Sequence, residues 1–173
     1  MDRSDKEDTM DPLVSGVMGS RSDWQTMKYV SETLAGMSVS HEVHIVSARR
    51  TSNRLLKYAK SVEENRVKVI IASASGAVYL PGILASKTHI PVIGVPINTK
   101  KSKAPNSSLS LMHMPIGLPV GTLAMGPAGA VNAALLATNI LANDHDVIRK
   151  ALVNYRAQQI TPSPHMMNPS VAV

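Results

Sequence analysis

The chain of 173 residues contains no cysteine and no phenylalanine, and aromatic residues make up only 3% of it. The lack of cysteine excludes disulfide bonds, zinc–thiolate centres and cysteine nucleophiles. Few aromatic side chains are available to stack against bases and the basic residues are scattered, so we expect no nucleic-acid partner despite a formal net charge of +6. No apolar run approaches the ~20 residues that span a bilayer. Because the polar N-terminus also lacks the apolar stretch of a secretory signal, we expect no membrane segment and a cytoplasmic protein.

Aliphatic residues take the place of the missing aromatic ones. Hydrophobic residues make up 44% of the chain, which indicates a folded protein and is typical of a buried parallel sheet covered by helices. The length suits a single domain. We expect this domain at residues 12–160, between flexible tails at 1–11 and 161–173, the second of which contains three prolines.

Short apolar runs alternate with segments of helical periodicity along the expected domain. Strands are predicted at residues 13–17, 43–46, 67–72, 91–95 and 120–125. A helix follows every strand except the fourth, after which residues 100–106 form a polar, basic loop, and a last amphipathic helix begins with Asp144 as its cap. This alternation predicts an α/β fold, a three-layer αβα arrangement with a doubly wound parallel sheet and right-handed crossovers. Ligands bind such sheets beyond the carboxyl ends of the strands, which selects the loops at 18–23, 47–51 and 73–79.

Motifs in and around these loops occur in a recognisable order. They are Met-Gly-Ser-Arg-Ser-Asp-Trp at 18–24, Leu-Pro-Gly at 80–82, Pro-Val-Ile-Gly-Val-Pro at 91–96, Met-Pro at 114–115 and Gly-Leu-Pro-Val-Gly-Thr-Leu-Ala at 117–124. Together they resemble the N5-carboxyaminoimidazole ribonucleotide mutase family over residues 12–155. The resemblance implies a flavodoxin-like fold, a homo-octamer with shared active sites, no cofactor and no metal. It also implies a role in purine synthesis, where a carboxylate moves from an exocyclic nitrogen of an aminoimidazole ribonucleotide to a ring carbon.

The resemblance also assigns a first set of binding residues. Ser20, Ser22 and Asp23 are expected to hold the phosphate and ribose of the substrate. Hydroxyls and backbone N–H groups at a helix start attract an anion, whereas Asp23 would contact a ribose hydroxyl. Ser47 and Arg50 match a serine and an arginine of the family, and the guanidinium would bind the phosphate in a forked geometry. The alternatives are helix capping for the first three residues and a solvated surface charge for Arg50.

One catalytic position of the family is changed in the second loop. Where the family reads Ser-Ala-His-Arg-Thr-Pro, residues 47–52 read Ser-Ala-Arg-Arg-Thr-Ser. The lost histidine is the proton carrier of the family, and imidazole suits this role because it titrates near neutrality. Arg49 keeps its proton, since an arginine pKa lies above ~12. We therefore expect Arg49 to hold a carboxylate rather than to relay a proton.

The third loop departs from the family in the same way. Its family sequence, Gly-Ala-Gly-Gly-Ala-Ala-His, becomes Ser-Ala-Ser-Gly-Ala-Val-Tyr at residues 73–79. Ser73 and Ser75 replace glycines, which narrows the space for an imidazole ring and carbon dioxide. We expect Ser73, Ser75 and Gly76 to line the substrate. Tyr79 replaces the second histidine and would supply a hydrogen bond or a proton as a second catalytic residue.

A further histidine lies near another changed position. The family has an arginine where this chain has Ile116, and His113 precedes it by three residues. His113 is either a proton carrier or a histidine packed beside a helix. The other histidines share no spacing that suggests a metal site.

Three functions remain open from the sequence. The first is a divergent enzyme that adds, removes or moves a carboxylate on a heteroaromatic ribonucleotide or related acid. The second is a non-catalytic relative that binds a nucleotide or assembles with an active paralogue. The third is the ordinary mutase reaction by an altered route. In each case the expected ligand is small and anionic, namely a phosphorylated ribose compound. Carbon dioxide or bicarbonate is the candidate for a second ligand.

A homo-oligomer, in particular an octamer, is expected from the helices near the C-terminus. The predicted helix at 128–142 is rich in small residues, and the last helix carries an apolar stripe. This stripe consists of Val147, Ile148, Ala151, Leu152 and Tyr155. Part of it would be exposed on a monomer, which favours contacts between subunits.

Overall fold

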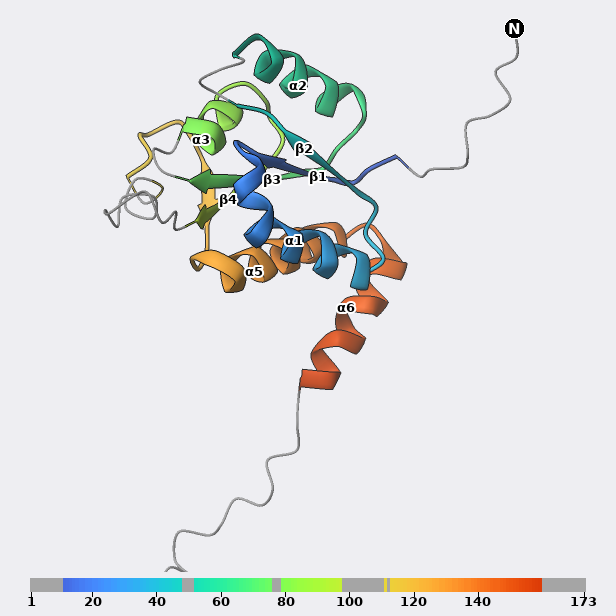
Figure 1. Cartoon of the computed structure of the whole chain (residues 1–173). Coiled ribbons are helices and arrows are strands. Elements are labelled where there is room, and N and C mark those ends of the chain that lie inside the picture. The colour runs from blue at the N-terminus through green and yellow to red at the C-terminus, as the bar shows by residue number, and fades with distance from the viewer. Residues whose placement is uncertain (1–10, 48–51, 76–78, 98–110, 112, 160–173) are drawn as a thin grey trace, which may run out of the picture.

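The computed structural model describes residues 11–47, 52–75, 79–97, 111 and 113–159. In this part of the chain five strands form one parallel sheet with helices on both faces, as Figure 1 shows. The predicted three-layer, flavodoxin-like α/β fold is therefore confirmed. The expected tails fall outside the described residues apart from Asp11, so the limits of the domain stay a prediction.

The order of the strands in the sheet places two loops of the predicted site side by side. The strands are β1 (Val14–Met18), β2 (His41–Ile45), β3 (Val69–Ser75), β4 (Val92–Ile97) and β5 (Val120–Thr122). Their order is β2-β1-β3-β4-β5, and all neighbouring pairs are parallel. The chain passes from β1 outward to β2 and then returns to the other side of β1. The switch point of the sheet, where ligands bind in this topology, therefore lies between β1 and β3.

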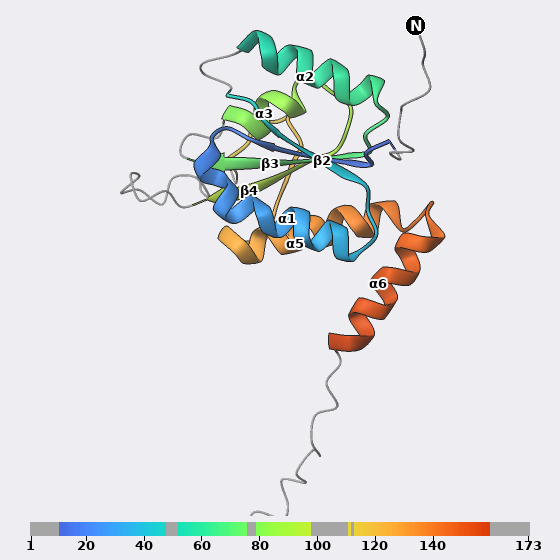
Figure 2. The same ribbon diagram turned by 45° about the vertical axis from the view of Figure 1, so that its right-hand side comes forward.

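The helices form the two outer layers. They are α1 (Trp24–Gly36), α2 (Ser52–Glu64), α3 (Tyr79–Ala85), α5 (Gly126–Leu141) and α6 (Asp146–Gln159), and the short 3-10 helix η1 (Arg21–Asp23) precedes α1. Figure 2 shows α2 and α3 on one face of the sheet and α1 and α5 on the other. Helix α6 packs against α5 and then extends away from the sheet (Figure 1).

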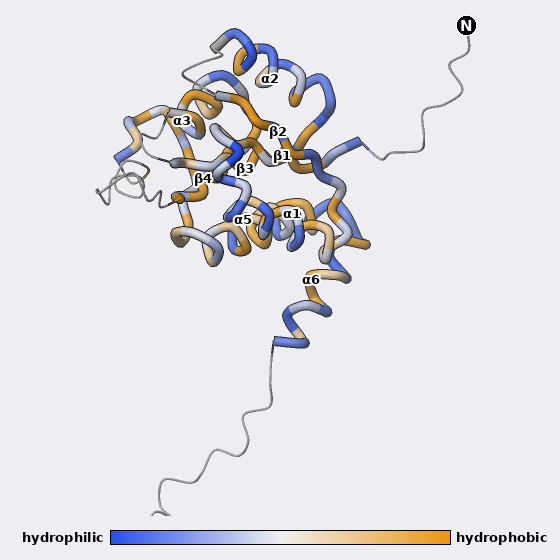
Figure 3. Tube along the Cα trace, in the orientation of Figure 1, coloured by the Kyte–Doolittle hydropathy of each residue, from blue (hydrophilic) through white to orange (hydrophobic). Residues whose placement is uncertain are grey.

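The alternation of side chains along the strands supplies both halves of the core. On β3, Val69 and Ile71 belong to the cluster with α1 and α5, whereas Ile70 and Ala72 belong to the cluster with α2 and α3. All four side chains are fully buried. Figure 3 shows that hydrophobic residues gather on the strands, while α2 turns hydrophilic residues outward. A sheet covered on both faces needs such continuous branched runs.

Several predicted element ends differ from the structure by one to three residues, and three of them bear on the site or on the helix caps. Strand β3 continues through Ser75, because Ser73 pairs with Val95 and Ser75 with Ile97 of β4, so the loop predicted from residue 73 is wrong there. Pairing with a neighbouring strand outweighs the low strand propensity of small polar residues. Strand β5 ends at Thr122, three residues early. Helix α6 begins at Asp146, which places residue 145, and not Asp144, at its cap position.

Candidate functional site at the carboxyl ends of β1 and β3

The switch point brings together residues that lie about fifty positions apart in the sequence. After β1 the chain turns at Gly19 and enters η1 and α1, while the end of β3 lies directly beside this turn. The backbone N–H of Gly19 donates to the Ser73 Oγ atom at 3.3 Å. The predicted first and third loops therefore meet, as the topology of the sheet requires.

Asp23 is the centre of a buried group of hydrogen bonds, which we call the Asp23 cluster and define as Asp23, Ser73 and Ser75. The Ser73 hydroxyl donates to Asp23 Oδ2 at 2.7 Å, and the Ser75 hydroxyl donates to the same oxygen at 3.1 Å. Asp23 is 1% exposed and Ser73 is 2% exposed. Within the described residues no ion pair involves Asp23. The Ser22 hydroxyl donates to Oδ1 at 3.5 Å, so serine hydroxyls contact both oxygens of this buried carboxylate in place of a cation.

Ser20 and Ser22 lie on the open side of the same turn. Both side chains are exposed. Their hydroxyl oxygens are 3.0 Å apart, and Ser20 Oγ accepts a hydrogen bond from the Ser22 backbone N–H at 3.3 Å. Ser20 therefore caps η1, whereas Asp23, at the cap position of α1, makes no side-chain cap bond. Two exposed hydroxyls at a helix start form an arrangement that suits an anion.

Of the predicted residues from the second loop, the structure describes Ser47. It is half-buried and lies two residues beyond the end of β2. The backbone N–H of the preceding Val46 donates to the Met18 carbonyl at 2.8 Å, which holds this segment against the end of β1. Ser47 therefore lies at the same edge of the sheet as Ser20 and Ser22. Arg49, Arg50, Gly76 and the side chain of Tyr79 are outside the described residues.

The segment containing His113 lies beside α3, the helix that Tyr79 begins. A Cβ atom on Gly82 of α3 would lie 3.3 Å from the sulfur of Met114, which shows how closely the two segments approach. His113 itself is exposed. The residue next to His113, Met114, is therefore packed against α3.

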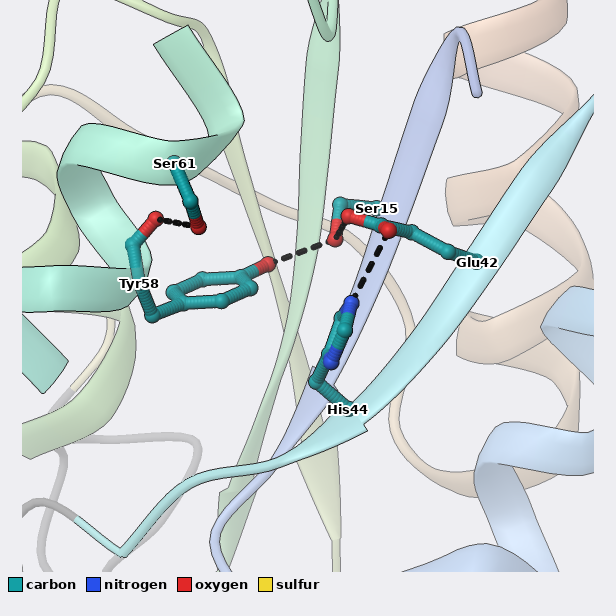
Figure 4. A network of polar contacts seen from close by, with 5 residues as sticks. All are labelled: Ser15, Glu42, His44, Tyr58 and Ser61. Atoms are coloured by element: carbon teal, nitrogen blue, oxygen red, sulfur yellow. Dashed lines mark hydrogen bonds and ion pairs between the residues drawn. The ribbon is translucent and has the colours of Figure 1, made fainter. Parts of the chain in front are cut away.

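Sequence reasoning missed a second polar network, which Figure 4 shows and which we call the Tyr58 network: Ser15, Glu42, His44 and Tyr58. The fully buried Ser15 hydroxyl lies 2.7 Å from Tyr58 Oη and donates to Glu42 Oε1 at 2.8 Å. His44 Nε2 lies 3.0 Å from the other Glu42 oxygen. A serine within an apolar strand was the available signal, because a buried hydroxyl needs a partner.

The Tyr58 network holds α2 on the sheet and does not belong to the switch point. Burial raises the pKa of Tyr58 well above its usual range; the Ser15 hydrogen bond opposes this rise and the Glu42 charge adds to it. A phenol with a raised pKa keeps its proton at neutral pH. Tyr58 is therefore a structural hydrogen-bonding group rather than a proton carrier.

Two other kinds of feature are absent from the described residues. No three histidine or acidic side chains there are grouped closely enough to hold a metal ion. None of the helices in that part of the chain has the length and apolar character needed to cross a bilayer.

A hollow lies at the amino ends of β4 and β5, between Pro91 and Pro119. It is at the edge of the sheet opposite the switch point and is walled mainly by apolar residues, so we assign the candidate site to the switch point.

Comparison with known proteins shows which family the chain belongs to. A family model described as AIR carboxylase matches residues 13–161. Three similar proteins are named N5-carboxyaminoimidazole ribonucleotide mutase. The relative from Pseudomonas aeruginosa is 47% identical over 150 residues, covering 87% of this chain and 92% of the relative. The relative from Escherichia coli is 48% identical, with 84% and 86% covered. The relative from Bacillus subtilis is 50% identical, with 82% and 88% covered.

The fold is similar to that of a solved relative as well. A crystal structure of Treponema denticola PurE superposes with a TM-score of 0.77 and 26% sequence identity. The superposition covers 86% of this chain and 91% of that chain. The similarity therefore extends over nearly the whole length of both proteins.

Proposed function

This chain belongs to the AIR carboxylase family, and on that premise we propose that it catalyses the carboxylate shift for which its relatives are named. The substrate would be N5-carboxyaminoimidazole ribonucleotide, and the proton would follow an altered route. This is the third of the functions left open by the sequence. The relatives favour it over a divergent carboxylase or decarboxylase, because the similar proteins cited above are all named as mutases.

The observation that carries the proposal is the open pair of hydroxyls on Ser20 and Ser22 at the switch point. Both hydroxyls lie at the start of α1, whose first turn receives no side-chain cap. Backbone N–H groups at a helix start and nearby hydroxyls stabilise a phosphate dianion. Ser47 lies at the same edge, and Arg50, three residues later in the chain, would add a guanidinium.

The reaction itself needs a proton carrier and a group that holds carbon dioxide. The bond between the exocyclic nitrogen and the carboxylate carbon breaks, and the nitrogen gains a proton as carbon dioxide leaves. The ring carbon then attacks carbon dioxide and loses a proton, so the net reaction is an isomerisation. Arg49 would hold the transferred carboxylate, because its guanidinium keeps its charge.

We assign the proton transfer to His113, with Tyr79 as the alternative. An imidazole takes up and releases a proton near neutrality, whereas a phenol with a pKa near ~10 is a weak acid. His113 is exposed, and its segment packs beside the helix that Tyr79 begins. Both groups would therefore approach the substrate from the side of the third loop.

A second candidate function is supported by the sequence of the same loops. Arginine and tyrosine stand at positions 49 and 79, where the family carries its two histidines. A chain with these changes and an intact phosphate site could bind the nucleotide without turning it over. Such a chain would be a binding or assembly partner of an active paralogue.

Turnover assays separate the two candidates. The wild type is incubated with N5-carboxyaminoimidazole ribonucleotide and formation of the ring-carboxylated product is followed. We expect slow but measurable turnover, a further loss of 10²–10⁴-fold in His113→Asn, and a gain in Arg49→His, which restores a proton carrier. Saturable binding without turnover in both the wild type and Arg49→His supports the binding protein instead. Absence of binding contradicts both candidates.

We also propose a homo-oligomer, on the basis of α6. Its residues Ile148 and Leu152 are buried, but Val147 and Val153 are 68% and 60% exposed. The small residues of α5, by contrast, pack within the described chain, so α5 contributes less to subunit contacts than expected. Light scattering at micromolar concentration is expected to show an octamer, and a stable monomer would contradict this. A cytoplasmic location is likewise part of the proposal, in keeping with purine synthesis.

A further inference from the structure

The Asp23 cluster has a feature that the carboxylate shift does not explain. The resemblance to the mutase family implies a contact between Asp23 and a ribose hydroxyl. Asp23 lies in the turn after β1, beside the end of β3. Its Oδ2 atom, however, already accepts hydrogen bonds from the hydroxyls of Ser73 and Ser75, at 2.7 and 3.1 Å.

The sheet holds both serines in position. Ser73 and Ser75 are two residues apart on β3, so their side chains leave the same face of the sheet. Val69 and Ile71, which share this face, pack in the cluster with α1. The pairing of β3 with β4 continues through Ser75. The two hydroxyls are therefore presented to the start of α1 by a paired strand.

Two members of the cluster are also closed to solvent, whereas Ser75 is half-buried. Asp23 is 1% exposed and Ser73 is 2% exposed. Ser73 Oγ is held from its other side by the N–H of Gly19 at 3.3 Å. A ligand hydroxyl can reach Oδ2 only by displacing a serine, and displacing Ser73 would leave a buried hydroxyl without its partner.

We propose that Ser73 and Ser75 determine specificity by taking the place of the two hydroxyls of a ribose on Asp23. The site then binds a phosphorylated heteroaromatic compound through its phosphate and its ring, and does not distinguish ribose from 2-deoxyribose. The inference rests on the proposed function, because it concerns the sugar of the same phosphorylated ligand. It assigns the pair a role that differs from direct contact with substrate, which the sequence predicted.

The test compares two sugar phosphates, ribose 5-phosphate and 2-deoxyribose 5-phosphate, by isothermal titration. The wild type should bind them with dissociation constants within about twofold of each other. The double variant Ser73→Gly/Ser75→Gly frees the carboxylate and opens space beside it. This variant should prefer ribose 5-phosphate by at least about tenfold, the effect of a hydrogen bond to a charged group. Adding Asp23→Asn to the double variant should remove most of the preference.

A matched control is Ser61→Gly. This residue is in α2 on the other face of the sheet, where its hydroxyl donates to the Tyr58 carbonyl. The change also places a glycine in a regular element, at a comparable cost in stability. The control should still bind the two sugar phosphates with dissociation constants within about twofold of each other, because it does not alter the Asp23 cluster. A ribose preference in this control would contradict the assignment to Ser73 and Ser75.

Several results would overturn the inference. One is a wild type that prefers ribose 5-phosphate by tenfold or more, and another is a folded glycine double variant without a preference. If the glycine variant does not fold, the ratio measured for the wild type decides. If the wild type binds neither sugar phosphate, the proposed phosphate site fails. In that case a gain of ribose 5-phosphate binding by the glycine variant supports the inference, and the lack of such a gain overturns it.

Discussion

Two networks that each join a serine to a carboxylate lie on opposite faces of one sheet, and they treat that carboxylate differently. In the Asp23 cluster the carboxylate is 1% exposed and hydroxyl groups satisfy it. In the Tyr58 network the Glu42 side chain is 25% exposed and also contacts His44 (Figure 4). Water can replace a lost partner of Glu42 but cannot reach Asp23. The same chemical groups therefore differ in how much the fold depends on them.

The two networks also differ in their place along the strands. Ser15 and Glu42 lie near the amino ends of β1 and β2, where they anchor α2. The Asp23 cluster lies at the carboxyl ends of β1 and β3, where ligands bind in this topology. Changes in the first network should thus alter stability alone, whereas changes in the second should alter both stability and ligand choice.

The largest effect is expected for Asp23→Ala. Removing the carboxylate leaves the Ser73 hydroxyl, and to a lesser degree the Ser75 hydroxyl, without an acceptor in a buried place. We expect the free energy of unfolding to fall by about 2–4 kcal/mol, measured by urea unfolding. The exposed Asp144→Ala, which also removes a carboxylate, is the control and should change it by less than about 0.5 kcal/mol. Equal, small effects of the two variants would remove the distinction between the networks.

An alkaline pH should weaken the Tyr58 network. Because burial raises the pKa of Tyr58, the folded chain keeps a proton that the unfolded chain loses above about pH 10. The stabilisation is complete below that pH and is lost as the pH rises toward the folded pKa. The wild type should lose up to about 1.4 kcal/mol by about pH 11 relative to Tyr58→Phe. If the urea midpoints of the two proteins change equally with pH across this range, burial of the phenol has no such effect.

At neutral pH, Tyr58→Phe is expected to have a moderate effect. The change removes the hydroxyl that lies 2.7 Å from Ser15 Oγ, but Ser15 keeps its hydrogen bond to Glu42. A loss of about 1 kcal/mol in the free energy of unfolding is expected. Sugar phosphate binding should stay as in the wild type. A change in binding would show that the two networks are coupled through the sheet.

The smallest effect is expected for His44→Gln. The imidazole is 43% exposed and its contact with Glu42 is solvent-screened. Exposed pairs of this kind contribute about 0–1 kcal/mol, so a change below about 0.5 kcal/mol in the free energy of unfolding is expected. A loss as large as that of Asp23→Ala would mean that Glu42 depends on a single partner, as Asp23 depends on its serines.

The sequence predicted the fold and selected the first and third loops for the candidate site, and the structure shows that these two loops meet. These follow from apolar periodicity and from the topology of parallel sheets. The direction in which Ser73 and Ser75 point could not be predicted, because Ser-Ala-Ser has the composition of a loop and only its pairing with β4 makes it a strand. The hydrogen-bond partner of Asp23, Ser73, could not be predicted either, because it lies fifty residues away in the sequence. The roles of Arg49, Arg50, Gly76 and Tyr79 stay predictions.

A crystal structure of the wild type with the ring-carboxylated aminoimidazole ribonucleotide would test the account most directly. We expect the phosphate to lie within hydrogen-bonding distance of Ser20 and Ser22, with Ser73 still bonded to Asp23 Oδ2 and Ser75 beside it. The ribose hydroxyls should then lie away from Asp23. A complex in which the two serines turn aside and Asp23 holds the ribose hydroxyls, or in which the phosphate binds elsewhere, would contradict the account.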